Sequence, residues 1–155
     1  MYEMSKKIIQ HLNPVWAEKA NFIIMANLDD SNKEIEKEQL WAQRISDTRF
    51  EICCIPFFVY GLSLGDEAET DESFVISKVV KISGQFTFRV WTKDTSNEEK
   101  LAITNYLSEN NYLYEFYSEN LLSISVKGKF AIQSITDYLA KQERKGHLVY
   151  ETGKL

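Results

Sequence analysis

Five acidic side chains form the densest group of residues in this chain that could do chemistry: Asp66, Glu67, Glu69, Asp71 and Glu72. Clustered carboxylates can bind calcium, act as a general acid and base, or attract a basic partner. Calcium-binding loops place oxygen ligands at alternate positions around a central glycine, and this run does not follow that pattern. A catalytic pair of carboxylates needs a pocket around it, and sequence alone does not show one.

The spacing of these acids favours a surface position. On an extended strand, Glu67, Glu69 and Asp71 share one face, with Cβ atoms about 7 Å apart. A row of like charges costs stability through repulsion, and a binding function would explain why it is tolerated. We therefore predict that all five acids contact a basic protein partner by charge complementarity. A merely solvated strand or loop is the simpler alternative.

The residues that serve most often as nucleophiles, bases and metal ligands are sparse. The two histidines, His11 and His147, stand in no motif with a nearby serine, cysteine or aspartate, so we interpret both as surface or structural residues. The only cysteines, Cys53 and Cys54, are neighbours that would point to opposite faces of a strand. No Cys-x-x-Cys pair is present, and we interpret both thiols as packing residues. We predict no catalytic residues and no metal site.

Phosphate-binding loops are also absent from the sequence. The six glycines do not group as GxGxxG or GxxxxGK[ST], so the chain predicts no nucleotide cofactor, and no other cofactor is indicated. Together with the sparse histidines and cysteines, this pattern indicates a protein that is not an enzyme.

Composition and charge restrict the class of partner. The chain has 155 residues, a net charge of −5 and 44% hydrophobic residues, which is ample for a core. Nucleic-acid binding usually requires a basic face, so the charge argues against that partner. The longest apolar run, from Ile52 to Leu64, is shorter than the roughly 20 residues of a membrane span. The first residues do not read as a signal peptide, and we expect a cytoplasmic protein with no membrane partner. Nothing in the sequence sets the oligomeric state.

The elements that position the acids form the first half of the chain. Residues 1–20 are expected to form an N-terminal arm, with a short helix or loose segment over 1–13. A charged loop is expected over 29–38, between the first two strands. Five short strands follow over 21–28, 39–45, 49–55, 67–73 and 74–82, and Pro56 should end or distort the third. Short strands without intervening helices suggest a small SH3-like β-barrel over residues 21–84.

The second half, residues 85–155, has a different pattern. Residues 86–92 alternate as a strand, and Ser96 with Glu99 forms a capping box for a helix over 97–109. A hairpin over 112–127, a helix over 129–144 and a strand over 147–151 complete a β-α-β-β-α-β order, which is typical of ferredoxin-like folds. The predicted class is therefore α+β.

One face of the second sheet could bind a ligand. It would carry Arg89 and Trp91, and with Tyr60 these residues could hold a small ligand or RNA between barrel and sheet. The strand lacks the glycines of an RNA-binding signature. We therefore favour the interpretation that this face packs against the barrel.

The segment Ile55 to Asp66, with sequence IPFFVYGLSLGD, carries a family resemblance. Together with Leu40-Trp41-Ala42, Ser83-Gly84 and Arg89-Val90, it resembles a bacterial domain-of-unknown-function family over residues 22–151. Members often have asparagine where this chain has Cys54, and apolar residues where it has acids after Gly65. The family has no established activity, so the resemblance implies a fold and leaves function open.

The leading functional hypothesis is a non-enzymatic immunity protein that neutralises a bacterial contact-dependent or polymorphic toxin by protein–protein binding. A small acidic protein without catalytic motifs suits a basic partner such as a nuclease toxin. The alternative is a regulatory domain that binds a small ligand or RNA through Tyr60, Arg89 and Trp91.

Overall fold

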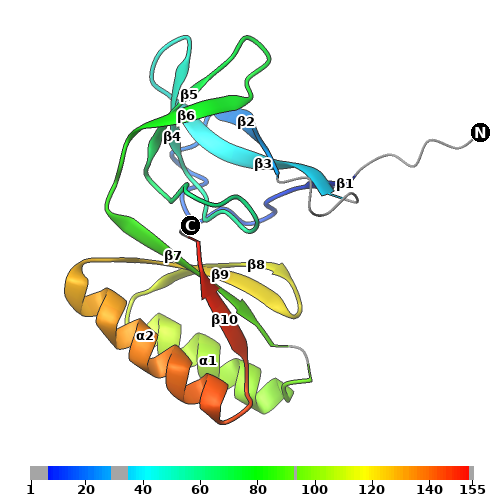
Figure 1. The fold of residues 1–155 in the computed structure, drawn as a ribbon, viewed down its shortest axis with the longest axis vertical. Coiled ribbons are helices and arrows are strands. Elements are labelled where there is room, and N and C mark those ends of the chain that lie inside the picture. Colours follow the sequence, from blue (N-terminus) through cyan, green and yellow to red (C-terminus); the bar gives the residue numbers. More distant parts are fainter. Residues whose placement is uncertain (1–6, 29–34, 93, 154–155) are drawn as a thin grey trace, which may run out of the picture.

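Two β-sheets and two helices make up the fold (Figure 1). The computed structural model describes residues 7–28, 35–92 and 94–153. The first sheet contains β1 (Lys7–Ile9), β2 (Phe22–Asn27), β3 (Ile35–Arg44), β4 (Arg49–Ile52), β5 (Glu67–Thr70) and β6 (Ile76–Lys81). The second part contains β7 (Gln85–Trp91), α1 (Asn97–Glu109), β8 (Leu113–Ser118), β9 (Leu121–Lys127), α2 (Lys129–Arg144) and β10 (Val149–Thr152). The α+β class is therefore confirmed.

The first sheet is not the closed barrel that the sequence suggested. Its strands follow the order β1-β3-β4-β5-β6, and β2 pairs with β3 off this path. A parallel bridge between Met25 and Val75 brings β2 near β6, but no ladder joins these two strands within the described residues. β4 and β5 have only four residues each, so they are too short to carry the sheet round to closure.

The N-terminal part also differs from the prediction. Residues 7–9 form a strand that pairs in parallel with β3, where a helix or loose segment was expected. β3 begins at Ile35, inside the predicted charged loop of residues 29–38, and the part of that loop from 29 to 34 lies outside the described residues. Pairing with both β1 and β2 explains why this charged stretch is extended, because a strand with partners on both sides satisfies its backbone groups.

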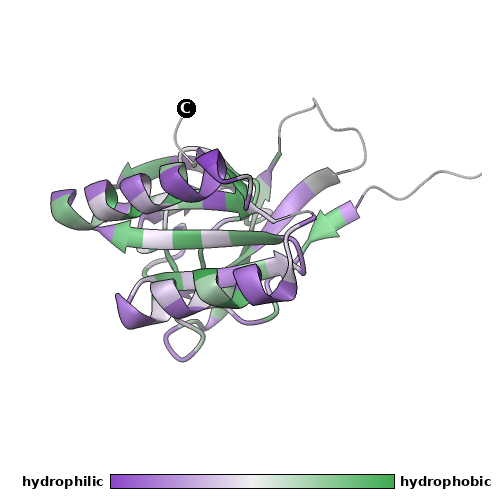
Figure 2. Cartoon of the chain, turned by 90° about the horizontal axis from the view of Figure 1, so that it is seen from below, coloured by the Kyte–Doolittle hydropathy of each residue, from purple (hydrophilic) through white to green (hydrophobic). Residues whose placement is uncertain are grey.

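The second sheet has the order β10-β7-β9-β8, and every pairing in it is antiparallel. Both helices cover the face that turns away from the first sheet (Figure 1). Phe88, Val90 and Ile124 of this face pack against Leu107 and Leu139 of the helices. Seen from the helix side, α1 and α2 alternate hydrophilic and apolar residues (Figure 2), as expected for helices that bury one stripe.

Local signals placed the helix ends correctly. Ser96 is the N-cap of α1, and its hydroxyl accepts a hydrogen bond from the Glu99 amide at 3.2 Å. Gly146 follows the end of α2 with a φ of 79°, a left-handed conformation that glycine adopts without strain. Neither helix in the described chain combines the length and apolarity that crossing a membrane requires.

A buried segment without regular structure lies between the two sheets. It runs from Cys53 to Asp66 and begins directly after β4, which ends at Ile52 and so stops before Pro56. Phe57, Leu62 and Leu64 are buried in it, so the apolar run forms part of the core. Because no strand pairs with it along its length, its backbone groups need other partners.

Candidate functional site

The first of the five predicted contact residues is not at the surface. Asp66 is only 3% exposed, and its two carboxylate oxygens accept hydrogen bonds from the amides of Ser63 at 2.9 Å and Ser83 at 2.8 Å. Asp66 therefore does not lie on the exposed acidic row that the sequence suggested, and its contact with a partner stays a prediction. Its carboxylate orders the Gly-Asp turn and ties that turn to the end of β6, as short aspartate side chains often do in turns.

Glu67 and Glu69 do lie on the outer face of β5, where Glu51 of β4 stands opposite Glu67 but the other neighbours in register are basic. Glu67 forms an ion pair with Lys81 at 3.6 Å, and Glu69 stands in register between Arg49 on β4 and Lys78 on β6. Basic neighbours therefore balance these two charges in part, and this face is a mixture of both signs rather than a uniform acidic row.

The remaining acids gather at one end of the first sheet. Asp71 and Glu72 are exposed in the turn after β5, and Asp71 accepts hydrogen bonds from the amides of Ser73 and Val75. The amide of Thr70 donates to the carbonyl of Thr48 at 2.9 Å, which places the β3–β4 turn beside this one. That turn contributes a further exposed acid, which the sequence analysis did not include. We define the acidic tip as Asp47, Glu69, Asp71 and Glu72.

A buried cluster of charges, which the sequence analysis missed, joins the N-terminal segment to both sheets. The Nε2 atom of His11 lies 2.6 Å from Glu38 of β3, and its Nδ1 atom lies 2.8 Å from Glu115 of β8. All three side chains are at most 4% exposed. The imidazole also stacks on Phe57, with ring centroids 4.2 Å apart. We refer to His11, Glu38 and Glu115 as the clamp.

The two carboxylates of the clamp also bind the backbone of the buried segment. Glu38 accepts hydrogen bonds from the amides of Phe57, Phe58 and Val59, at 2.8, 2.9 and 3.1 Å. Glu115 accepts from the amide of Ile55 at 2.6 Å. Side chains thus replace the missing strand partners of the segment, and this satisfies backbone groups that would otherwise be costly to bury.

The carbonyl groups of the same segment are held from the second sheet. The hydroxyl of Ser123 donates to the carbonyl of Ile55 at 3.0 Å, and the Arg89 guanidinium donates to the carbonyl of Val59. The segment is therefore fixed on one side by β3 and on the other by β7, β8 and β9.

Electrostatics favour a charged clamp. Burial works against the imidazolium of His11, but the neighbouring Cys54 and the carboxylates of Glu115 and Glu38 raise its pKa well above the ordinary value. Burial likewise opposes ionisation of Glu38, yet its hydrogen bond to His11, the charge of His11 and the backbone amides lower its pKa. One imidazolium between two carboxylates leaves one negative charge, which the donated amides stabilise.

The clamp brings a thiol next to a histidine, but not in a catalytic arrangement. Cys54 contacts His11, and burial raises the pKa of its thiol despite the imidazolium beside it. Both ring nitrogens already face carboxylates, so the imidazole has no nitrogen left to act as a base towards Cys54. Burial also raises the pKa of Cys53, to about 11. Both cysteines are fully buried, which confirms their interpretation as packing residues.

A signal in the sequence could have identified Glu38. In β3 the residues Glu38, Leu40 and Ala42 alternate with more exposed neighbours and point to the same buried side. An acid in phase with an apolar face needs a partner inside the protein. The partner proved to be a histidine 27 positions away, which no local pattern could indicate.

The predicted ligand face around Arg89 is largely closed. Arg89 is 1% exposed, its guanidinium lies 4.6 Å from the centroid of the Tyr60 ring, and its Nη1 atom lies 3.7 Å from Glu151. Tyr60 is exposed at the rim and donates a hydrogen bond to Glu151 at 2.7 Å, which raises the pKa of the tyrosine. Trp91 is half-buried further along β7. The buried segment covers this face, as the preferred interpretation of the sequence had it.

A cavity of about 220 Å³ opens where the two sheets meet. Apolar side chains of Ile82, Phe86 and Ile132 form part of its lining. Its other lining residues are polar or glycine: Gly61, Ser63, Asp66, Gly84, Gln85, Thr87 and Gly153. We call it the seam cavity.

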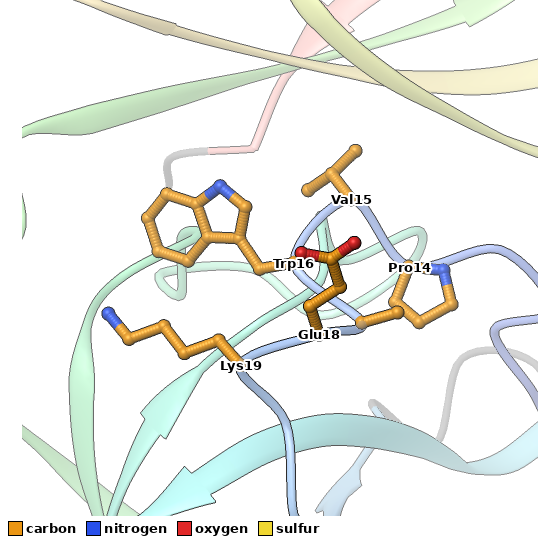
Figure 3. Close-up of a pocket in the computed structure, with 6 residues that line it drawn as sticks. Pro14, Val15, Trp16, Glu18 and Lys19 are labelled. Atoms are coloured by element: carbon orange, nitrogen blue, oxygen red, sulfur yellow. The ribbon is translucent and has the colours of Figure 1, made fainter.

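A wider hollow of about 480 Å³ lies beside the turn of residues 14–19 (Figure 3). Trp16 lines it, and the ammonium group of Lys19 lies 5.1 Å from the centroid of the Trp16 ring while it pairs with Glu51. A Cβ atom at Gly65 would lie 3.3 Å from the far edge of the same indole, so Trp16 packs close to the turn of the buried segment. Its aromatic face is thus already used by a cation of the protein itself.

No three His, Cys, Asp or Glu side chains converge as a metal site anywhere in the described part of the chain. In the clamp, the two carboxylates lie at different nitrogens of the same ring, so they do not point to a common centre.

Comparisons with known proteins agree with the fold. A hypothetical protein from Neisseria gonorrhoeae, known from a crystal structure, resembles this chain with a TM-score of 0.68 and 25% identity over 83% of this chain and 91% of that one. No protein of curated function matches. Residues 38–150 match the family described as a domain of unknown function, DUF4265. That range covers most of the chain, and the protein therefore belongs to the DUF4265 family, which confirms the resemblance to a domain-of-unknown-function family.

Proposed function

We propose that this protein is a non-enzymatic, cytoplasmic binding protein that neutralises a basic bacterial toxin by protein–protein contact, as an immunity protein does. The observation that carries the proposal is the acidic tip, where two neighbouring turns bring together acids from separate hairpins. A net charge of −5 favours encounter with a basic protein, because complementary charge speeds association.

The proposed contact surface is narrower than the acidic run suggested. Glu69 and Glu72 are its principal residues, together with Asp47 and Asp71. Arg44 and Arg49 lie in or beside the same hairpin, and Arg44 forms an ion pair with Asp47 at 3.8 Å. With Lys78, which stands opposite Glu69, the tip carries four acids against three bases, a small negative charge that suits steering and orientation more than tight binding.

Co-expression with the product of the neighbouring gene tests this function. A complex is expected to co-purify, and the double variant Glu69→Lys/Glu72→Lys should slow association and reduce its dependence on salt. The control Glu18→Lys/Glu109→Lys makes the same change of charge at two exposed positions outside the acidic tip. If no complex forms, or if both double variants behave alike, the proposal is wrong.

A second candidate is a regulatory domain that holds a small ligand between the two sheets. The seam cavity supports it, because it offers both apolar and polar lining at the boundary of the two halves. RNA has less support, since Arg89 is buried and committed to neighbouring groups. A ligand-induced rise in melting temperature that Ile132→Trp abolishes would favour this candidate, and a rise that persists in that variant would count against it.

We also propose that the second half of the chain has a ferredoxin-like fold. The strand order β10-β7-β9-β8 and the two helices on one face support a ferredoxin-like second half. We further propose an incomplete SH3-like arrangement for the first half. The boundaries at residues 20 and 84 remain predictions, and the turn at Gly84, where the chain passes from β6 to β7, supports the second of them.

A further inference from the structure

We propose that the seam cavity binds the side chain of a lysine that a basic protein partner supplies. The inference rests on the proposed function for the source of that lysine, but the chemistry of the cavity stands on its own lining. Three observations carry it: a buried carboxylate that forms no ion pair within the described residues, an apolar wall, and a volume that suits one side chain.

The carboxylate is Asp66. It lines the cavity, is almost fully buried, and accepts one backbone amide at each oxygen. A carboxylate has about four acceptor positions, so capacity for further donors remains. No ion pair with Asp66 occurs among residues 7–28, 35–92 and 94–153. Lys127 comes close to the cavity where its Cε atom lies against Gly84, yet it forms no ion pair with Asp66 within the described chain.

The rest of the lining suits the remainder of a lysine. Ile82, Phe86 and Ile132 offer apolar surface for the methylene groups, while Ser63 and Thr87 offer hydroxyl oxygens that can accept from an ammonium group. An anion would meet the negative charge of Asp66, so the lining favours a cation.

The volume also selects among ligands. At about 220 Å³ the cavity is smaller than the clefts of roughly 300–1,000 Å³ that hold drug-sized molecules. A nucleotide or a folded peptide segment would not enter, whereas one flexible side chain would. Ile82 stands at the mouth and is 80% exposed, so a partner has direct access there.

A titration of the full ¹⁵N-labelled chain with Nα-acetyl-lysine methylamide tests the proposal. The expected result is a saturable shift of the amides of Ser63, Gly84 and Gly153, with a dissociation constant in the millimolar range, since a single side chain makes few contacts. Nα-acetyl-norleucine methylamide, which lacks the ammonium group, should leave these amides unchanged. Equal shifts with both compounds, or none with the lysine compound, would overturn the assignment.

Charge variants at the mouth sharpen the test without disturbing the buried carboxylate. Ile82→Lys and Ile82→Glu remove the same apolar contact but add opposite charges, and at about 7 Å from the ammonium in water each charge changes affinity about threefold. The lysine variant should bind the probe more weakly than the glutamate variant, by about tenfold. Leu101→Lys and Leu101→Glu, at a 60% exposed position on α1, should bind alike. No difference between the two Ile82 variants would contradict an electrostatic site.

Two further arms separate the remaining possibilities. If the Asp66→Asn variant folds, it should not show the amide shifts that the capped lysine causes. If that variant does not fold, the comparison of Ile82→Lys with Ile82→Glu tests the proposal. If butylammonium binds and the capped lysine does not, the ligand of the cavity is a free small amine and not a lysine of a protein, and the proposal is overturned. If the acidic-tip variants leave partner binding unchanged, the proposed function fails, while the outcome of the capped-lysine titration is unaffected.

Discussion

Replacing His11 by alanine tests the energetic role of the clamp most directly. The variant removes the cation from between two buried carboxylates, which lie 2.6 and 2.8 Å from its ring nitrogens. Breaking a buried ion pair by deleting one partner costs about 3–5 kcal/mol, because the remaining charge stays buried without compensation. A domain of this size has a total stability of roughly 5–15 kcal/mol, so the loss would be a large part of it.

Urea denaturation at pH 7 measures this loss. With a dependence of about 2 kcal/mol per molar urea, the midpoint should fall by about 1.5–2.5 M. His147→Ala is the matched control, because that histidine contacts Glu99 at 3.2 Å in a half-buried position. Exposed pairs contribute about 0–1 kcal/mol, so the control should shift the midpoint by less than about 0.5 M. Equal shifts for both variants would refute the reasoning.

A triple variant separates charge pairing from the capture of the backbone. Replacing His11, Glu38 and Glu115 together by leucine removes every charge, and for an ordinary buried ion network such a change is often neutral or stabilising. Here the amides that the two carboxylates hold would lose their acceptors, at about 1–3 kcal/mol each. We therefore expect the triple variant not to fold. If it is as stable as the wild type, the hydrogen bonds from the backbone amides to Glu38 and Glu115 contribute little to stability.

Further predictions concern the charge of His11, the burial of Cys54 and the turn at Gly65. Because the pKa of His11 is raised from 6.5, its contribution to stability is complete below about pH 6.5 and is lost as the pH rises through the folded pKa. The stability difference between wild type and His11→Ala should therefore shrink by up to about 1.4 kcal/mol per unit above that pH, and a constant difference up to pH 9 would contradict a protonated clamp. Cys54, buried beside its neighbouring thiol, should escape a thiol reagent until urea unfolds the chain, and rapid labelling of the native protein would contradict its burial. In urea titrations Gly65→Ala should lower the free energy of unfolding more than Gly61→Ala. Both glycines have a positive φ, but only at Gly65 would a Cβ atom meet a neighbour, at 3.0 Å from Ser83. Equal losses of stability would refute this prediction.

Much of the second half could be predicted because its signals are local. The capping box at Ser96, the alternation of residues 86–92 and the glycine after α2 each specify a conformation within a few residues. The β-α-β-β-α-β order then leaves few ways to bury the apolar faces, and the observed sheet with both helices on one side is one of them.

The first half was harder to predict because its strands depend on distant partners. β1 has only three residues and forms because β3 offers an edge, which no pattern in residues 1–13 indicates. The closed barrel failed because strand number and turn spacing do not set strand length or curvature, and both must agree before a sheet can close. Glu38 was assigned to a solvated loop, yet it is buried, because His11 and three backbone amides meet it there.

By itself, the sequence determined the α+β class, the two helices with their ends, the apolar character of the segment after β4, and the family to which the chain belongs. Periodicity and capping are properties of neighbouring residues, so they can be read along the chain. The tertiary structure alone decided which charges are buried and which remain at the surface. It buried the carboxylate of Asp66 and placed the turn that contains Asp47 beside the turn after β5. It also joined His11 to Glu115 across 104 positions. Burial and pairing of a charge depend on what the fold brings next to it, and for these residues the partners come from other strands.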